Sequence, residues 1–178
     1  ANENIGDGEC AIIMGLAGTD VVKNRTNGFT ERLEELGSKI KVVDSQNADW
    51  DRNTAKDVAA TILKTYPDLK IICCNNDVMA MGALEAVKES GKTLNKDVYV
   101  IGMDGTDEAY ESIRANELSA TVSMYPLYES QMATECAVRI LLGQEMPSVI
   151  WTPAMVTDAT NVDADEADTI GWTDPTFE

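Results

Sequence analysis

The sequence of 178 residues predicts an α/β fold, a doubly wound parallel sheet flanked by helices. Short runs rich in Val and Ile alternate along the chain with longer segments whose apolar residues recur at helical spacing. These runs are continuously apolar, as in strands that are covered on both faces. Few residues separate each run from the next segment, and 44% hydrophobic residues supply a core.

Strands are expected at residues 10–16, 40–43, 71–74, 98–101, 120–124 and 149–155. Helices are expected from after residue 20 to residue 36, and at 51–66, 77–90, 107–115 and 128–142. In the first helix, the residues expected to face the sheet are Val22, Phe29, Leu33 and Leu36. Asp51 and Asp77 are expected to cap helix N-termini.

Charge and composition exclude several kinds of function. The 31 acidic and 14 basic residues leave a net charge of −17, which disfavours nucleic acid and anionic membranes as partners. The absence of histidine excludes His-based triads and His-ligated metals. No apolar run approaches the roughly 18 residues that span a membrane. The motifs of serine hydrolases, P-loop proteins and dinucleotide-binding enzymes are absent, so we expect neither an enzyme nor a cofactor.

The four cysteines show no metal-binding spacing, and no metal site is expected. Cys73 and Cys74 are neighbours in a predicted strand, so their side chains point to opposite faces. The thiols are therefore interpreted as small buried hydrophobes. A disulfide between Cys10 and Cys74 is conceivable if their two strands are adjacent.

Ligands of open α/β sheets bind beyond the carboxyl ends of the strands, which here carry polar and aromatic side chains. The candidate ligand-binding residues are Asp20, Arg25, Trp50, Asn76, Asp104 and Met124. Planar Arg and Asn groups and carboxylates bind neighbouring hydroxyls, and an indole suits the apolar face of a sugar ring. The rim therefore favours a carbohydrate ligand.

One segment, Asn-Asn-Asp-Val-Met-Ala-Met-Gly-Ala-Leu-Glu-Ala-Val (75–87), resembles the type I periplasmic sugar-binding proteins. These are the ribose-, galactose/glucose- and allose-binding proteins, which are related to the ligand domains of lac-type repressors. Further matches in order and spacing are Gly-Leu-Ala-Gly-Thr (15–19), Arg-Thr-Asn-Gly-Phe (25–29), Ala-Asp-Trp-Asp (48–51), Val-Ile-Gly-Met-Asp-Gly-Thr (100–106) and Leu-Ser-Ala-Thr-Val (118–122). The resemblance covers about residues 8–162.

The resemblance implies a non-catalytic, extracytoplasmic receptor that delivers a monosaccharide to an ABC-type permease. It assigns ligand contacts to Arg25, Trp50, Asn76 and Asp104, and it places Met124 where the family usually has Gln or Asn. Tryptophan at position 50 favours a pyranose, and so a hexose slightly over a pentose. The ligand domain of a lac-type repressor or of a membrane sensor is the alternative, because the same lobe serves there. A module that contacts a permease or chemoreceptor without binding sugar is a third possibility.

The resemblance also divides the chain. Residues 8–124 correspond to the family's C-terminal lobe, residues 125–157 to a segment that contacts the N-terminal lobe and returns, and residues 158–178 form an acidic tail. The N-terminal lobe itself is missing, so the sequence is interpreted as an isolated lobe. Its helix at 128–142 is then expected to need that lobe as partner, or to self-associate.

Overall fold

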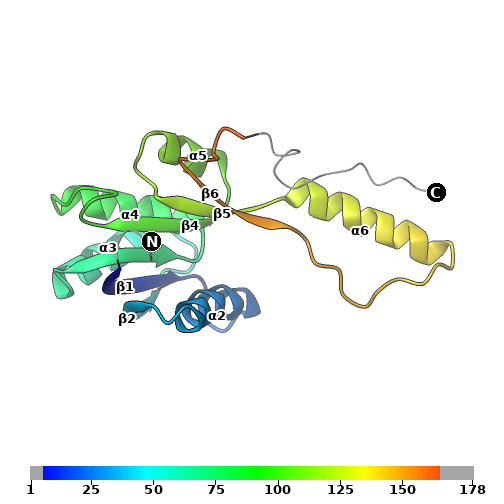
Figure 1. Cartoon of the computed structure of the whole chain (residues 1–178), viewed down its shortest axis with the longest axis horizontal. Coiled ribbons are helices and arrows are strands. Elements are labelled where there is room, and N and C mark those ends of the chain that lie inside the picture. Colours follow the sequence, from blue (N-terminus) through cyan, green and yellow to red (C-terminus); the bar gives the residue numbers. More distant parts are fainter. Residues whose placement is uncertain (1–5, 165–178) are drawn as a thin grey trace.

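Six strands form one sheet in the order β2-β1-β3-β4-β5-β6 in the computed structural model, which describes residues 6–164 (Figure 1). The strands are β1 (Asp7–Met14), β2 (Lys39–Asn47), β3 (Leu69–Cys74), β4 (Tyr99–Asp104), β5 (Ala120–Met124) and β6 (Ala154–Asp158). The helices are α2 (Asp20–Glu35), α3 (Arg52–Thr65), α4 (Asp77–Glu89), α5 (Asp107–Arg114) and α6 (Pro126–Leu141). The first five strands are parallel, and β6 runs antiparallel to β5. The predicted fold class is confirmed.

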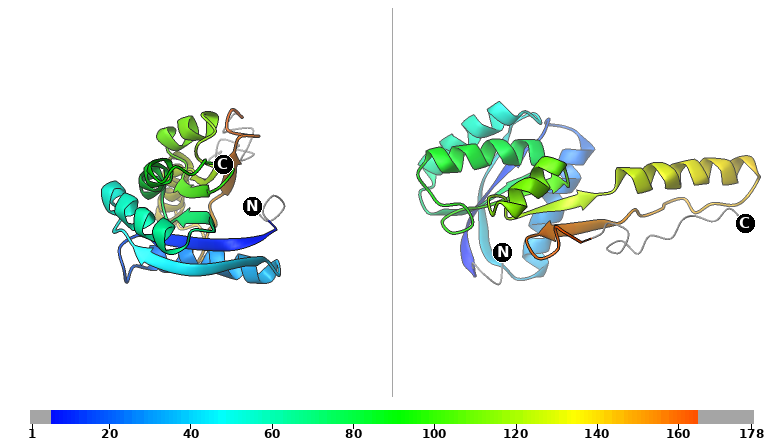
Figure 2. Two further views of the ribbon diagram at one scale, coloured as in Figure 1. Left: turned by 90° about the vertical axis from the view of Figure 1, so that its left-hand side faces the viewer. Right: turned by 90° about the horizontal axis from the view of Figure 1, so that it is seen from above.

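Helices cover both faces of the sheet (Figure 2). One face, with Ile13 and Ile72, packs against α3, α4 and α5 in the main core. The other face, with Cys10, Ile40 and Ile71, packs against Phe29 and Leu33 of α2. Alternate strand residues are therefore buried on opposite sides, which explains why the strands are apolar throughout.

Hydroxyl, carboxylate and carboxamide side chains cap the N-termini of four helices. Thr19, Asp51, Asn76 and Thr106 each accept a hydrogen bond from a main-chain N–H in the first turn. The predicted cap at Asp51 is confirmed. The predicted cap at Asp77 is wrong by one residue, because Asn76 caps α4 while Asp77 is fully buried in its first turn.

Helix α6 projects away from the sheet, and residues 142–153 run back beside it to β6 (Figures 1 and 2). Its exposed apolar side chains include Leu127, Ile140 and Leu141, which are 71%, 62% and 85% exposed. The prediction of a strand at 149–155 is wrong for residues 149–153, because pairing with β5 begins only at Ala154. Trp151 is 89% exposed. No neighbouring strand lies beside 149–153 within the described residues, so nothing pairs with that backbone.

Two smaller expectations are also wrong. Leu36 is 49% exposed, because α2 ends one residue before it and its main chain serves as the C-cap. The side chains of Cys10 and Cys74 lie on opposite faces of the sheet, since they belong to different core clusters. All four cysteines are free thiols, and burial raises the pKa of Cys10 and of Cys74 well above the usual value. Both are buried, as predicted.

The predicted acidic tail begins within the folded part. Residue Asp158 ends β6, and Asp163 pairs with Arg114 of α5 at 2.7 Å. Val162 packs against the main core. Residues 159–164 are thus attached to the lobe, and residues 165–178 lie outside the described part of the chain.

Candidate functional site

Three of the predicted ligand residues meet at the carboxyl edge of the sheet. Arg25 lies in the second turn of α2, Trp50 follows β2, and Asp104 ends β4. Arg25 Nη2 lies 2.8 Å from Asp104 Oδ1, and Arg25 Cζ lies 5.9 Å from the centroid of the Trp50 ring. Arg25 Nη1 donates to the main-chain carbonyl of Asn75 at 2.6 Å. A cation, a carboxylate and an aromatic ring therefore hold one another in place.

Trp50 is positioned by an unusual turn. Asp49 and Trp50 both have left-handed backbone conformations, with φ of 51° and 67°. The turn is closed by hydrogen bonds from Ala48 N to Met14 O at 2.7 Å and from Asp51 N to Ala48 O at 2.8 Å. The indole then lies against Gly15, where a Cβ would come within 2.2 Å of ring atoms. Gly15 is a functional position that the sequence analysis treated only as part of a motif.

Asp104 carries backbone strain at the same edge. Its φ of 127° lies in a region that favours glycine, and such residues cluster at binding and catalytic sites. Burial raises the pKa of its carboxyl above the ordinary value; this effect outweighs the lowering by the Arg25 guanidinium, and Asp77 adds to the rise. The carboxyl group is thus held in a costly position and is tied to Arg25.

The other three predicted residues have different surroundings. Asn76 Oδ1 accepts from Met79 N at 2.9 Å as the cap of α4, and the side chain is half-buried. Asp20 is exposed in the first turn of α2, five residues before Arg25. Met124 is half-buried at the end of β5, opposite Ala154. Their contact with a ligand stays a prediction.

Asp77 has a structural task beside this site. Its two carboxylate oxygens accept hydrogen bonds from Gly105 N at 2.9 Å, Thr106 N at 2.8 Å and Thr121 Oγ1 at 2.7 Å. The loop that follows Asp104 is therefore attached to the start of α4. Asp77 is recognisable in the sequence as a polar residue at a helix start, but these partners are not, because they lie 28 to 44 positions away.

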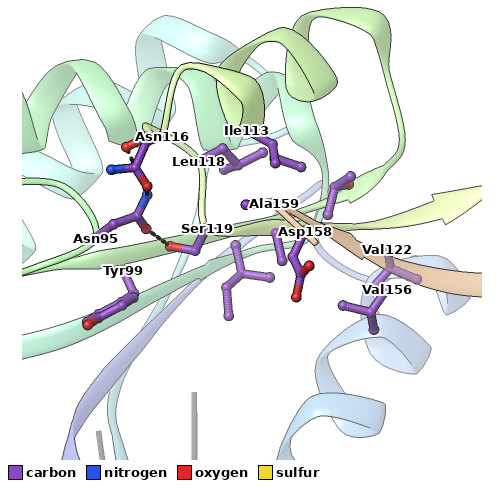
Figure 3. Close-up of a pocket in the computed structure, with 13 residues that line it drawn as sticks. Asn95, Tyr99, Ile113, Asn116, Leu118, Ser119, Val122, Val156, Asp158 and Ala159 are labelled. Atoms are coloured by element: carbon purple, nitrogen blue, oxygen red, sulfur yellow. Dashed lines mark hydrogen bonds between the residues drawn. The ribbon is translucent and has the colours of Figure 1, made fainter. Parts of the chain in front are cut away.

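A hollow of about 350 Å³ lies elsewhere, at the opposite ends of β4 and β5 (Figure 3). Tyr99 and Ala120, the first residues of these strands, line it together with Asp158 at the end of β6. Polar residues at its rim form hydrogen bonds with one another, since Asn95 Nδ2 donates to Asn116 O at 2.9 Å. None of the six predicted ligand residues lines this hollow.

Two features bear on metals and membranes. Among residues 6–164, no three His, Cys, Asp or Glu side chains are grouped so as to hold a metal ion. No helix in the described part of the chain is both long and apolar enough to cross a membrane.

The sequence model of the family described as "Periplasmic binding protein domain" matches residues 1–145, and the chain belongs to this family. It is 47% identical over 119 residues to the D-allose-binding periplasmic protein of Escherichia coli, and this alignment covers 67% of this chain and 37% of that protein. It is 37% identical over 152 residues to the ribose import binding protein of Bacillus subtilis, covering 85% of this chain and 48% of that protein.

A crystal structure gives the same result for the fold. An ABC transporter periplasmic solute binding protein from Actinobacillus succinogenes, with bound D-allose, superposes with a TM-score of 0.83 at 33% identity. The match covers 90% of this chain and 56% of that protein. The chain thus spans about half the length, or less, of the curated relatives it matches.

Proposed function

We propose that this chain forms one wall of a monosaccharide-binding cleft in an extracytoplasmic receptor of an ABC-type importer, and that it is not an enzyme. The observation that carries this proposal is that Arg25 contacts both Trp50 and Asp104 at the carboxyl edge of the sheet. Membership of the periplasmic binding protein family supports it. The names of the relatives, which are import and solute-binding proteins, favour a receptor over a repressor domain.

The three side chains offer what a sugar ring requires. A guanidinium has five N–H donors, and Asn75 O and Asp104 engage one each of Nη1 and Nη2, so further donors remain for hydroxyls. Asp104 accepts hydrogen bonds from hydroxyls, and charge-assisted bonds of this kind are the stronger ones. The indole of Trp50 offers a flat apolar surface to the C–H face of the ring.

A hexose in pyranose form is the favoured ligand. The indole has a larger face than a phenyl ring, which suits a six-membered sugar. The thioether of Met124 is a poor hydrogen-bond partner, so the ligand is expected to present no hydroxyl to the end of β5. Both D-allose and ribose occur in the names of the relatives, so a hexose and a pentose can be compared directly.

The other wall of the cleft is proposed to come from a second half of the receptor. The chain covers 37% to 49% of the length of three relatives named for ribose or D-allose binding. Helix α6 exposes Leu127, Ile140 and Leu141, and this apolar surface fits contact with such a half. A single wall covers only part of a ligand, so the chain alone is expected to bind sugar weakly.

Calorimetric titration with D-allose and D-ribose tests the proposal. The samples are the chain alone and a chimera in which it follows the N-terminal half of the E. coli D-allose-binding protein. We expect binding by the chimera, tighter for D-allose, and much weaker binding by the chain. Arg25→Met in the chimera should weaken binding about 10- to 100-fold, because charged hydrogen bonds are lost.

The matched control is Arg32→Met, on the same helix. Arg32 is exposed and pairs with Glu35 at 2.8 Å, so its loss should leave the affinity unchanged. Equal affinities of the parent and Arg25→Met chimeras would overturn the proposed site. Micromolar binding by the monomeric chain alone would overturn the need for a second half.

A further inference from the structure

Asn75 stands between two neighbours with separate tasks. Asn76 caps α4, and Asp77 holds the loop after Asp104. Asn75 is only 2% exposed, so its carboxamide cannot touch a ligand in the cleft. Its side chain instead contacts Gly15 and Thr26, in the segment between β1 and the middle of α2.

The contacts of Asn75 form a bridge. Its Nδ2 donates to Thr26 Oγ1 at 3.3 Å, and its Oδ1 lies 3.4 Å from Gly15 N. Its main-chain N donates to Ile13 O at 2.9 Å, which extends the pairing of β3 with β1. Its main-chain O accepts from Arg25 Nη1 at 2.6 Å. Asn75 thus contacts both the helix that carries Arg25 and the glycine against which Trp50 lies.

Through these contacts Asn75 supports both Arg25 and the ring of Trp50. Thr26 is next to Arg25 on α2, and Gly15 is the surface against which the Trp50 indole lies. Movement of Asn75 would therefore shift the guanidinium and the ring relative to each other. The distance of 5.9 Å between them is close to the limit of a cation–π contact, so a small shift is enough to weaken it.

We infer that Asn75 is a positioning residue, which sets the relative placement of Arg25 and Trp50 through a buried amide bridge to Gly15 and Thr26. The inference rests on the proposed function, because the placement affects binding only if Arg25 and Trp50 contact a sugar. The placement itself can be measured without sugar. An amide is suited to the task because one end donates to Thr26 and the other accepts from Gly15.

The test uses the fluorescence of Trp50 in the full chain, with Trp151 and Trp172 replaced by Phe. The variants are Asn75→Ala, which removes the bridge, and the pair Thr26→Val and Thr26→Ser, which remove or keep the hydroxyl. We expect Asn75→Ala and Thr26→Val to change the emission maximum and increase acrylamide quenching of Trp50. Thr26→Ser should keep the parent values, and so should Asn27→Ala, a control at an exposed position of α2.

In the sugar-binding chimera, Asn75→Ala and Thr26→Val should weaken the affinity about five- to tenfold, the effect of one buried hydrogen bond. Thr26→Val is nearly isosteric, so it keeps the test valid if Asn75→Ala does not fold. Unchanged Trp50 quenching in Thr26→Val, or a loss of thermal stability with unchanged quenching and affinity, would overturn the inference. Altered quenching in a chimera without sugar affinity would instead refute the proposed function alone.

Discussion

The Trp50 indole lies directly against Gly15, so that a Cβ at position 15 would lie 2.2 to 2.4 Å from three atoms of the ring. Gly15 follows β1, and Trp50 follows β2, the neighbouring strand. The strand ends thus meet through a glycine and an aromatic ring. This contact determines where the apolar face for a ligand lies.

Gly15→Ala should displace the indole. A methyl group cannot fit at that distance, so the ring must move away from the guanidinium of Arg25. We expect a shifted Trp50 emission and an affinity for D-allose about 5- to 30-fold weaker in the chimera, since misplaced contacts of this kind cost about 1 to 2 kcal/mol. Gly28→Ala, with open space around its Cα, is the control. Parent-like emission of Gly15→Ala would contradict the prediction.

Asp77→Ala should destabilise the lobe. The substitution removes the acceptor for Gly105 N, Thr106 N and Thr121 Oγ1 in a fully buried place. Unsatisfied buried donors cost about 1 to 3 kcal/mol each in isolation, and partial relaxation should leave a net loss of about 3 kcal/mol. Urea unfolding at neutral pH measures it. Asp57→Ala, at an exposed position of α3, should change the free energy of unfolding by less than about 0.5 kcal/mol; equal values for the two variants would be inconsistent with this role.

Gly82→Ala should also destabilise, against helix propensity. Alanine is favoured over glycine inside a helix by about 1 kcal/mol. A Cβ at Gly82, however, would lie 2.1 Å from the main-chain O of Arg52, where α4 approaches α3. Separating two packed helices costs more than the propensity gain, so we expect a net loss of about 2 kcal/mol or more. Gly28→Ala, in the open part of α2, should instead be neutral or stabilising, and the opposite signs make the comparison decisive.

Asp104 should affect the pH dependence of stability. Burial raises the pKa of its carboxyl, so the folded protein holds this proton more tightly than the unfolded chain does. The contribution of Asp104 to the free energy of unfolding therefore falls as the pH rises through the raised pKa, and it is most favourable below the ordinary pKa of an aspartate.

Asp104→Asn removes this contribution. We expect the variant to gain stability relative to the parent as the pH rises from 4 to 7, measured by urea unfolding at each pH. Asp51, Asp97 and Asp158, whose pKa values are lowered by hydrogen bonds, have the opposite effect on stability in both proteins. Their effects therefore cancel when the free energies of unfolding of the variant and the parent are subtracted at each pH. A parent that gains relative to the variant with rising pH would show that the ion pair with Arg25 outweighs burial.

Local patterns predicted most of the fold. The strand at 120–124 is predicted at both ends, and the other four parallel strands overlap their predicted positions along the chain, because apolar periodicity and terminating residues are short-range features. The last strand was placed too early, since Val149 and Ile150 are apolar but lack a neighbouring strand within the described residues. Leu36 was placed inside because its spacing is helical, although α2 has already ended there. Whether the side chains of Cys10 and Cys74 face each other depends on the register of β1 with β3, which no local sequence pattern contains.

The candidate site divides in the same way. The sequence alone indicates that Arg25, Trp50 and Asp104 follow strand ends, because each lies within nine residues of the end of an apolar run. Only the tertiary structure decided that Arg25 contacts both other residues, that Gly15 supports the indole, and that Asn75 joins these supports. These contacts connect residues 25 to 79 positions apart. Their geometry depends on the order of strands in the sheet and on backbone conformations that residue type alone does not specify.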